Sequence, residues 1–144
     1  MDKKYDYMIG KYQHRFLEQR LKELPISRSE APYLKVIYKN GQIKMNDLIA
    51  KFFFHKSHTT RVIKSLVGDG YVIKTVDPDD KRGFVLSITD KGKAVALKII
   101  KVLDEWDNLM ESFLEKEEIE YLFNLQKKVY EKLQDYFKEN DANE

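Results

Sequence analysis

Apolar side chains recur every three or four residues along most of this chain, which is the spacing of one face of an α-helix. The first such stretch starts near the N-terminus and predicts a helix that Pro25 ends, because proline cannot continue a helix interior. A second helix is predicted to reach about Lys39. Ser27 and Glu30 have the spacing of a capping box at its start, with Ser29 as an alternative cap.

Two shorter helices are predicted next, over about residues 47–53 and 56–67. Before them, residues 42–44 are compatible with a very short strand. The second of the two helices has one apolar stripe, which would face the core and leave a polar, basic face outside. The residues of that stripe are Thr59, Val62, Ile63 and Leu66.

A β-hairpin is predicted after these helices. Residues 71–76 are rich in β-branched and aromatic side chains, and residues 84–88 alternate between two faces as a strand does. Between them, Asp77 and Pro78 have the chemistry of the first two positions of a type I turn. The hairpin is therefore expected to have a long charged tip.

Two long helices complete the chain. Thr89 can cap the first, whose apolar stripe extends to about Leu114. The second starts with acidic residues at 115–118, which suit the positive end of a helix dipole, and its apolar stripe extends to Phe137. Helix–turn–helix followed by a hairpin is the winged helix-turn-helix arrangement. The predicted fold class is mainly α (α+β winged helix-turn-helix), with a small β-hairpin wing and with N- and C-terminal helices that form a dimerisation layer.

The composition narrows the class of protein. The chain has 144 residues, which is the size of one domain. The absence of cysteine excludes a disulfide scaffold, a thiolate zinc site, a cysteine nucleophile and a thiol redox switch. No apolar run approaches the ~18 residues that a membrane span needs, and the first residues lack the pattern of a signal peptide. We therefore expect a cytoplasmic protein with no membrane partner.

The charge is distributed unevenly along the chain. Residues 1–34 carry 7 basic and 5 acidic side chains, a net charge of +2. Residues 35–101 carry 14 basic and 6 acidic side chains, a net charge of +8, whereas residues 102–144 carry 5 basic and 13 acidic side chains, a net charge of −8. The basic third coincides with the predicted winged unit, so this unit is expected to meet a polyanion such as double-stranded DNA.

Two pairs of motifs and one shorter stretch, Leu66 with residues 70–72 (GYV), carry a family resemblance. Residues 47–50 (DLIA) and 56–61 (KSHTTR) fall in the two short helices, and residues 77–82 (DPDDKR) and 86–92 (LSITDKG) span the hairpin and its exit. The first pair resembles the helix-turn-recognition helix of the MarR family of bacterial and archaeal regulators. The second pair resembles that family's wing motif, D-x-R followed by L-T-x-x-G, with Ile88 in place of the usual leucine.

The resemblance implies a single MarR-like domain over 1–144, with a winged helix-turn-helix DNA-binding lobe over 27–100. Residues 1–24 and 101–140 would form a helical dimerisation region. The terminal helices also carry more apolar side chains than a small winged lobe can cover, and a second copy would bury them economically. The alternative is that these helices pack only on each other.

The candidate DNA-binding side chains lie first on the fourth predicted helix. Those that point away from its apolar stripe are Lys56, Ser57, His58, Thr60, Arg61 and Lys64. Arg61 can pair bidentately with guanine in the major groove, and Lys56 and Lys64 suit phosphates. The hydroxyl groups of Ser57 and Thr60 can bind either base edges or phosphates. The alternative is an ordinary solvated helix face.

The hairpin tip supplies the other candidates, Asp80, Lys81 and Arg82. Lys81 and Arg82 extend the basic surface. The resemblance implies that Arg82 reaches into the minor groove and that Asp80 steadies it through an ion pair. A narrow minor groove concentrates negative potential, which attracts such an arginine.

The resemblance also implies a small effector, often aromatic or anionic, bound between the dimer helices and the winged lobe. The aromatic residues that could line such a site are Tyr12, Phe16, Tyr33, Tyr38 and Trp106. At helical spacing the same residues also suit the core. No cofactor is expected, and His55 and His58 provide too few ligands for a metal site. No catalytic motif is present, so we do not expect an enzyme.

The predicted function is a sequence-specific double-stranded DNA-binding regulator, a ligand-responsive repressor that binds pseudo-palindromic promoter sites as a homodimer. Two alternatives stay open. A nonspecific architectural DNA binder would show steep salt dependence with little sequence preference, and a winged-helix protein–protein adaptor would show no salt-sensitive DNA affinity.

Overall fold

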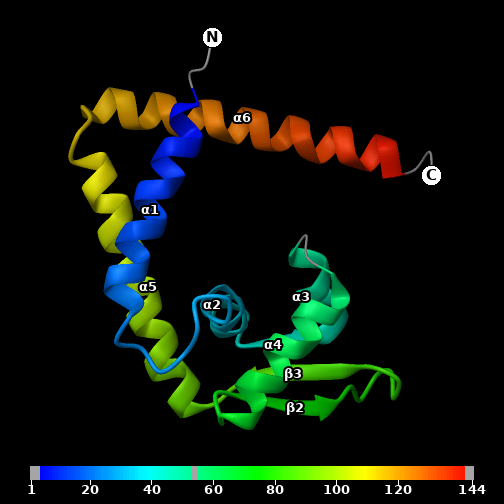
Figure 1. Cartoon of the computed structure of the whole chain (residues 1–144). Helices are drawn as coiled ribbons and strands as arrows, with labels where there is room; N and C mark the ends of the chain where they lie inside the picture. The colour runs from blue at the N-terminus through cyan, green and yellow to red at the C-terminus, as the bar shows by residue number, and fades with distance from the viewer. Residues whose placement is uncertain (1–3, 53–54, 142–144) are drawn as a thin grey trace. The chain divides into compact units, whose positions relative to one another are not determined.

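The computed structural model describes residues 4–52 and 55–141 and confirms the predicted fold class, mostly helical with a small antiparallel sheet (Figure 1). The elements in chain order are α1 (Tyr5–Leu21), α2 (Ala31–Asn40), β1 (Gln42–Lys44), α3 (Met45–Lys51), α4 (Lys56–Gly68), β2 (Val72–Val76), β3 (Phe84–Ile88), α5 (Asp90–Glu111) and α6 (Lys116–Asp141). The chain divides into two compact units, Met1–Trp106 and Asp107–Glu144. The first contains the whole winged lobe.

The core of the first unit lies between the helices α2, α3, α4 and α5 and one end of the sheet. It contains fully buried side chains of α2, α3, α4, β2, β3 and α5, whereas α1 contributes none. The largest are Tyr33, Leu34, Ile37, Leu48, Ile63, Leu66, Leu86 and Ile99. All four residues of the stripe expected on α4 are buried, so the hydrophobic pattern alone set which face of this helix points outward.

The sheet has the strand order β1-β3-β2, and both pairings are antiparallel. The hairpin register pairs Val72 with Ile88 and Val76 with Phe84. The short β1 strand joins the other side of β3, where Ile43 pairs with Leu86. The central strand is therefore β3, and β2 is an edge strand.

Several helix ends differ from the predicted ones by a few residues. α1 ends at Leu21 rather than just before Pro25, because the chain turns early, with the Leu24 N–H bonded to the Leu21 carbonyl at 3.0 Å. α5 ends at Glu111 rather than near Leu114. There the backbone changes to i→i−3 bonds, so the apolar spacing continues while the α-helix does not.

The capping box before α2 forms as predicted. The Ser27 N–H donates to Glu30 Oε1 at 3.1 Å, and the Glu30 N–H donates to Ser27 Oγ at 3.3 Å. The box closes the turn that precedes α2, whose first residue is Ala31. Ser29 does not replace Ser27 as the cap. Its hydroxyl pairs with that of Ser27 at 3.0 Å.

The junction between β3 and α5 explains the T-x-x-G part of the motif. The Thr89 hydroxyl donates to the Gly70 carbonyl at 2.7 Å and accepts the Gly92 N–H at 3.0 Å, so Thr89 caps α5 as predicted. The Thr89 N–H also bonds to the Tyr71 carbonyl at 3.1 Å. This close approach leaves no space at Gly92, where an added Cβ would overlap the Tyr71 carbonyl oxygen.

α1 contacts the part of α5 that belongs to the first unit. Arg20 pairs with Glu105 at 3.0 Å, and the rings of Phe16 and Trp106 lie 5.5 Å apart. By these contacts α1 belongs with the winged lobe in one compact unit, although the sequence grouped residues 1–24 with 101–140. Whether α1 also takes part in a dimer stays a prediction.

The second unit consists of the last turns of α5 and the whole of α6. The Glu115 N–H donates to Glu118 Oε2 at 2.9 Å, which caps the start of α6. Along the described side chains of α6, large apolar residues are exposed. These are Tyr121, Leu122, Phe123, Leu125, Val129, Tyr130, Leu133, Tyr136 and Phe137. Within residues 4–52 and 55–141, no helix combines the length and apolar character needed to cross a membrane.

Candidate nucleic-acid interface

The outer face of α4 presents a compact polar and basic surface. Its buried stripe points the remaining side chains to solvent, and five of the six candidates line one shallow hollow along the helix. These are Lys56, Ser57, Thr60, Arg61 and Lys64. The Thr60 hydroxyl donates to the Lys56 carbonyl at 2.9 Å, which leaves its oxygen free to accept but not to donate.

His58 differs from the other five candidates. Its side chain is only partly exposed, and its ring centre lies 6.1 Å from that of Tyr33. The expectation that His58 points outward like its neighbours is therefore only partly met, because its position on the helix borders the buried stripe at Thr59. His58 therefore packs near the Tyr33 ring in addition to any contact that it makes with a ligand.

A buried hydrogen bond joins α4 to α2. The Tyr33 hydroxyl and Thr59 Oγ1 lie 2.9 Å apart, and both residues are almost completely buried. The Tyr33 ring also stacks on Phe52 at 4.1 Å between centres. A polar side chain is stable at such a depth only when it is bonded, so this pair favours one placement of α4 on α2.

The aromatic residues proposed for an effector site lie in different environments. Tyr33 and Trp106 are both buried, Phe16 contacts Trp106, and Tyr12 is 64% exposed. Tyr38 is partly buried against the core. Tyr33 cannot line an open crevice in this arrangement, which agrees with the core alternative for that residue.

The hairpin tip, residues 77–83 (the wing loop), is ordered by its own aspartates. Asp80 Oδ1 accepts from the Arg82 N–H at 3.1 Å and from Arg82 Nε at 3.3 Å. The expected pair of Asp80 and Arg82 is therefore present, with the Arg82 side chain 92% exposed. Lys81 is also exposed. The pair holds the guanidinium group in place without covering it.

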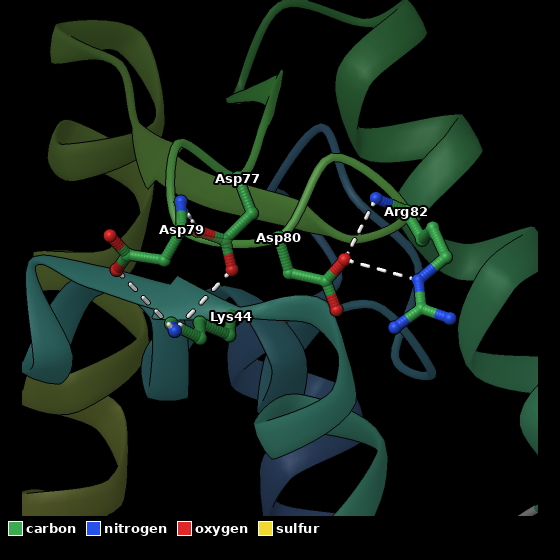
Figure 2. Close-up of polar contacts among 5 residues, drawn as sticks. All are labelled: Lys44, Asp77, Asp79, Asp80 and Arg82. Atoms are coloured by element: carbon green, nitrogen blue, oxygen red, sulfur yellow. Dashed lines mark hydrogen bonds and ion pairs between the residues drawn. The ribbon is translucent and has the colours of Figure 1, made fainter.

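A second group of charges at the base of the wing loop was not singled out in the sequence. Asp77, only 4% exposed, accepts the Asp79 N–H on Oδ1 at 2.9 Å. Its Oδ2 lies 3.4 Å from Lys44 Nζ, and Asp79 Oδ2 lies 3.8 Å from the same atom. Figure 2 shows both carboxylates directed at Lys44, while Asp80 is directed at Arg82.

The only sequence signal for this group was the turn chemistry of Asp77. Lys44 is 33 residues earlier in the chain. Its contact depends on the pairing of β1 with β3, which places Lys44 opposite Val85. No local pattern predicts such a pair, because it is set by strand register between distant segments.

The environment shifts the titration of both partners. The pKa of Asp77 is lowered, first because the Asp79 backbone N–H bonds to its carboxylate and then because Lys44 lies beside it; burial opposes these effects. The pKa of Lys44 is raised, chiefly because its ammonium group bonds to the Asp77 carboxylate. Both shifts favour the charged pair.

These shifts predict how the wing loop responds to pH. Because the pKa of Asp77 lies below its ordinary value of 3.8, its contribution to stability is present above that value and is lost as the pH falls through the lower folded pKa. The Lys44 contribution is present below 10.5 and is lost as the pH rises through the raised folded pKa. We expect the wing loop to be unchanged between these limits.

An NMR titration of the Asp79 amide, which reports on the Asp77 carboxylate, measures this directly. The expected midpoint lies below 3.8. A midpoint at or above the ordinary value would contradict the hydrogen-bonded geometry at the base of the loop.

The surface lacks the side chains of a metal site among the described residues. In the part of the chain that the structure describes, no group of three or more histidine, cysteine or acidic side chains is arranged to hold a metal ion. His55 is exposed just before α4. The interface therefore consists of cations, hydroxyl groups and one ordered arginine, which can bind anions and hydrogen-bonding edges.

The fold and this surface define a winged helix-turn-helix protein. The sequence pattern of the MarR family matches residues 26–84, from the turn before α2 to the first residue of β3. The chain is 37% identical over 123 residues to the HTH-type transcriptional regulator BilQ of Clostridioides difficile, covering 83% of each chain. The chain therefore belongs to the MarR family of transcriptional regulators.

Solved structures have the same fold. A MarR protein from Peptoclostridium difficile matches with a TM-score of 0.81 and 25% identity, over 94% of this chain and 90% of that one. A mutant of E. coli MarR, solved in complex with operator DNA, matches with a TM-score of 0.76 and 24% identity, over 88% and 91% of the two chains. The second likeness concerns the fold alone.

Proposed function

We propose that this protein binds double-stranded promoter DNA in a sequence-specific manner in the cytoplasm, as a homodimer, and that it represses transcription by occupying the promoter. The observation that carries the proposal is the exposed cationic face of α4, joined in one compact unit to a hairpin with an ordered, exposed arginine. Figure 1 shows the hairpin running out from the C-terminal end of α4. The operator complex of the E. coli relative supports DNA as the partner.

The two elements suit two parts of a duplex. The major groove, about 12 Å wide, admits an α-helix, and hydrogen-bonding side chains read base edges there. Lys56 and Lys64 at the margins of the α4 surface suit phosphates, while Arg61 lies between them and suits a guanine edge. The wing loop would place Arg82 in the neighbouring minor groove.

A second copy is proposed as the partner of α6. Its exposed apolar residues recur at spacings of three and four and lie on one broad face, as Leu122, Leu125, Val129 and Leu133 illustrate. Within the second unit, an apolar groove between the end of α5 and the start of α6 adds to this surface. A dimer would present two α4 helices, which fits a pseudo-palindromic site with half-sites about one helical turn apart.

We also propose that a small aromatic or anionic effector regulates binding. Support comes from the contact between Phe16 and Trp106, which joins α1 to α5 through aromatic side chains. Trp106 is the single tryptophan of the chain, so its fluorescence reports on this contact. Quenching by benzoate that saturates, and that lowers DNA affinity, supports the proposal; an unchanged spectrum and affinity contradict it.

Fluorescence anisotropy with duplexes from the region upstream of the protein's own gene tests the main proposal. We expect one duplex to bind at least about a thousandfold more tightly than a scrambled duplex of equal length. Equal affinity with steep salt dependence would identify a nonspecific architectural binder. No salt-sensitive binding to any duplex would favour a protein–protein adaptor.

Arg61→Ala is expected to flatten sequence preference. If Arg61 reads a guanine edge, the variant loses roughly 1–3 kcal/mol of discrimination at one base pair in each half-site while scrambled DNA binds almost as before. Single-base substitutions across the best duplex locate that position. An unchanged preference with a uniformly weaker affinity would show that Arg61 holds a phosphate instead.

Arg82→Ala is expected to weaken binding without destabilising the fold, because the Arg82 side chain is almost fully exposed. The loss should be greatest for duplexes with an A·T-rich segment beside the half-site, where the minor groove is narrow. Lys81→Ala, which removes a neighbouring exposed charge that lacks the Asp80 contact, measures how much affinity the loss of any wing-loop cation costs, and Arg82→Ala should exceed it. Wild-type affinity in Arg82→Ala would exclude the proposed role of the wing loop.

A further inference from the structure

We propose that Lys44 is a positioning residue for DNA binding, which holds the wing loop, and with it Arg82, in the orientation that meets the duplex. We call the contacts of Lys44 with Asp77 and Asp79 the Lys44 strap. The inference rests on the proposed DNA-binding function. It adds a residue of β1, which lies outside both α4 and the wing loop.

Strand pairing places Lys44 next to the base of the wing loop. Its β-bridge partner Val85 is only two residues beyond Gly83, the last residue of the loop. From there its ammonium group reaches Asp77 Oδ2 at 3.4 Å and Asp79 Oδ2 at 3.8 Å. Figure 2 shows the two contacts on one side of the loop and the Asp80–Arg82 pair farther along it.

Hydrogen bonds connect the base of the wing loop to its tip. The Asp77 N–H donates to the Gly83 carbonyl, and the Gly83 N–H donates to the Asp80 carbonyl, each at 2.9 Å. Asp80 in turn holds Arg82 through its backbone N–H and Nε. Backbone hydrogen bonds therefore connect Asp77, through Gly83, to Asp80, and Asp80 holds Arg82. A restraint on Asp77 restrains Arg82 as well.

The strand that leads into the wing loop has few buried side chains. β2 is an edge strand, and four of its five residues, from Ile73 to Val76, are exposed. Segments with few buried contacts fluctuate most readily. A fluctuating wing loop would have to be ordered on binding, which weakens affinity, whereas the Lys44 strap orders it in advance.

The direction in which one substitution changes DNA affinity distinguishes this proposal from a purely electrostatic effect. Asp77→Asn keeps an oxygen that can accept the Asp79 N–H, and it removes a negative charge from a surface that meets DNA. Electrostatics alone predicts tighter binding of the variant. Loss of the Lys44 strap predicts weaker binding, by about three- to tenfold.

The experiment measures anisotropy with the best upstream duplex for Asp77→Asn and Lys44→Met. Asp69→Asn is the control, since it removes an exposed carboxylate of the same basic segment that takes no part in the strap. We expect both strap variants to bind more weakly and the control to bind at least as tightly as the wild type. Lys44→Arg, which keeps the charge and can still reach the carboxylates, should restore most of the affinity.

A double-mutant cycle then identifies the route of the effect. If Lys44 acts through Arg82, Lys44→Met has almost no further effect in the Arg82→Ala background. If Lys44 binds a phosphate directly, the two losses multiply. Hydrogen exchange of the Gly83 amide in the free protein should also accelerate in Lys44→Met, a change that loss of a phosphate contact would not produce.

The possible failures are distinguishable. Tighter binding of Asp77→Asn, or multiplied losses in the cycle, would overturn the positioning role while leaving the DNA-binding proposal intact. Wild-type affinity in Lys44→Met would do the same. If the wild-type protein bound no duplex, the proposed function itself would fail, and this inference would fail with it.

Discussion

Leu133→Glu is expected to convert a dimer into a monomer and to lower affinity for a two-half-site duplex by about a hundredfold or more, because two linked half-site contacts become one. Leu133 is 49% exposed on the apolar face of α6 in the isolated chain. A second copy would bury it, and a buried carboxylate without a partner is strongly unfavourable. Analytical ultracentrifugation at micromolar concentration measures the state of assembly.

Asn124→Glu provides the matched control. It introduces the same charge on the same helix, but at a position on the polar side of α6, away from the apolar face. We expect this variant to stay dimeric and to bind DNA like the wild type. A wild-type protein that sediments only as a monomer, or a Leu133→Glu variant that stays dimeric, would remove α6 as the dimer contact.

Gly92→Ala is expected to destabilise the winged unit by about 3 kcal/mol or more, which is a large part of the 5–15 kcal/mol typical of a domain. The new Cβ would overlap the backbone carbonyl of Tyr71. A backbone atom cannot rotate away as a flexible side chain can. To relieve this overlap, α5 has to move away from the Gly70–Tyr71 turn, which breaks the Thr89 contacts that join them.

Gly68→Ala distinguishes this steric effect from a general loss of glycine. Gly68 is the last residue of α4, and an added Cβ there meets nothing within 4 Å. Alanine favours the helix over glycine, so this variant should be as stable as the wild type or slightly more so. Urea unfolding followed by circular dichroism compares the two. A Gly92→Ala variant as stable as the wild type would show that the β3–α5 junction can relax.

The sequence alone determined the elements and the outward face of α4. Its four buried residues follow helical spacing, and this spacing is a local property that one sequence carries completely. The same holds for the Thr89 cap, whose partner Gly92 is three residues away, whereas the Asp80–Arg82 pair was expected from the resemblance to the MarR family. The wing motif also contained Gly92, although only the packing of α5 against Tyr71 showed why no larger residue fits there.

Tertiary structure decided the relations between distant segments. The Lys44 strap depends on which strand pairs with β3 and in which register, and the Tyr33–Thr59 bond depends on how α2 meets α4. The tertiary structure also shows that Tyr33, a candidate effector residue, is buried in the core. His58 is only partly exposed on α4, because its ring lies near that of Tyr33. The spacing of residues along the chain specifies which face of a helix or strand is apolar. Which other element that face packs against depends on the packing of the whole unit.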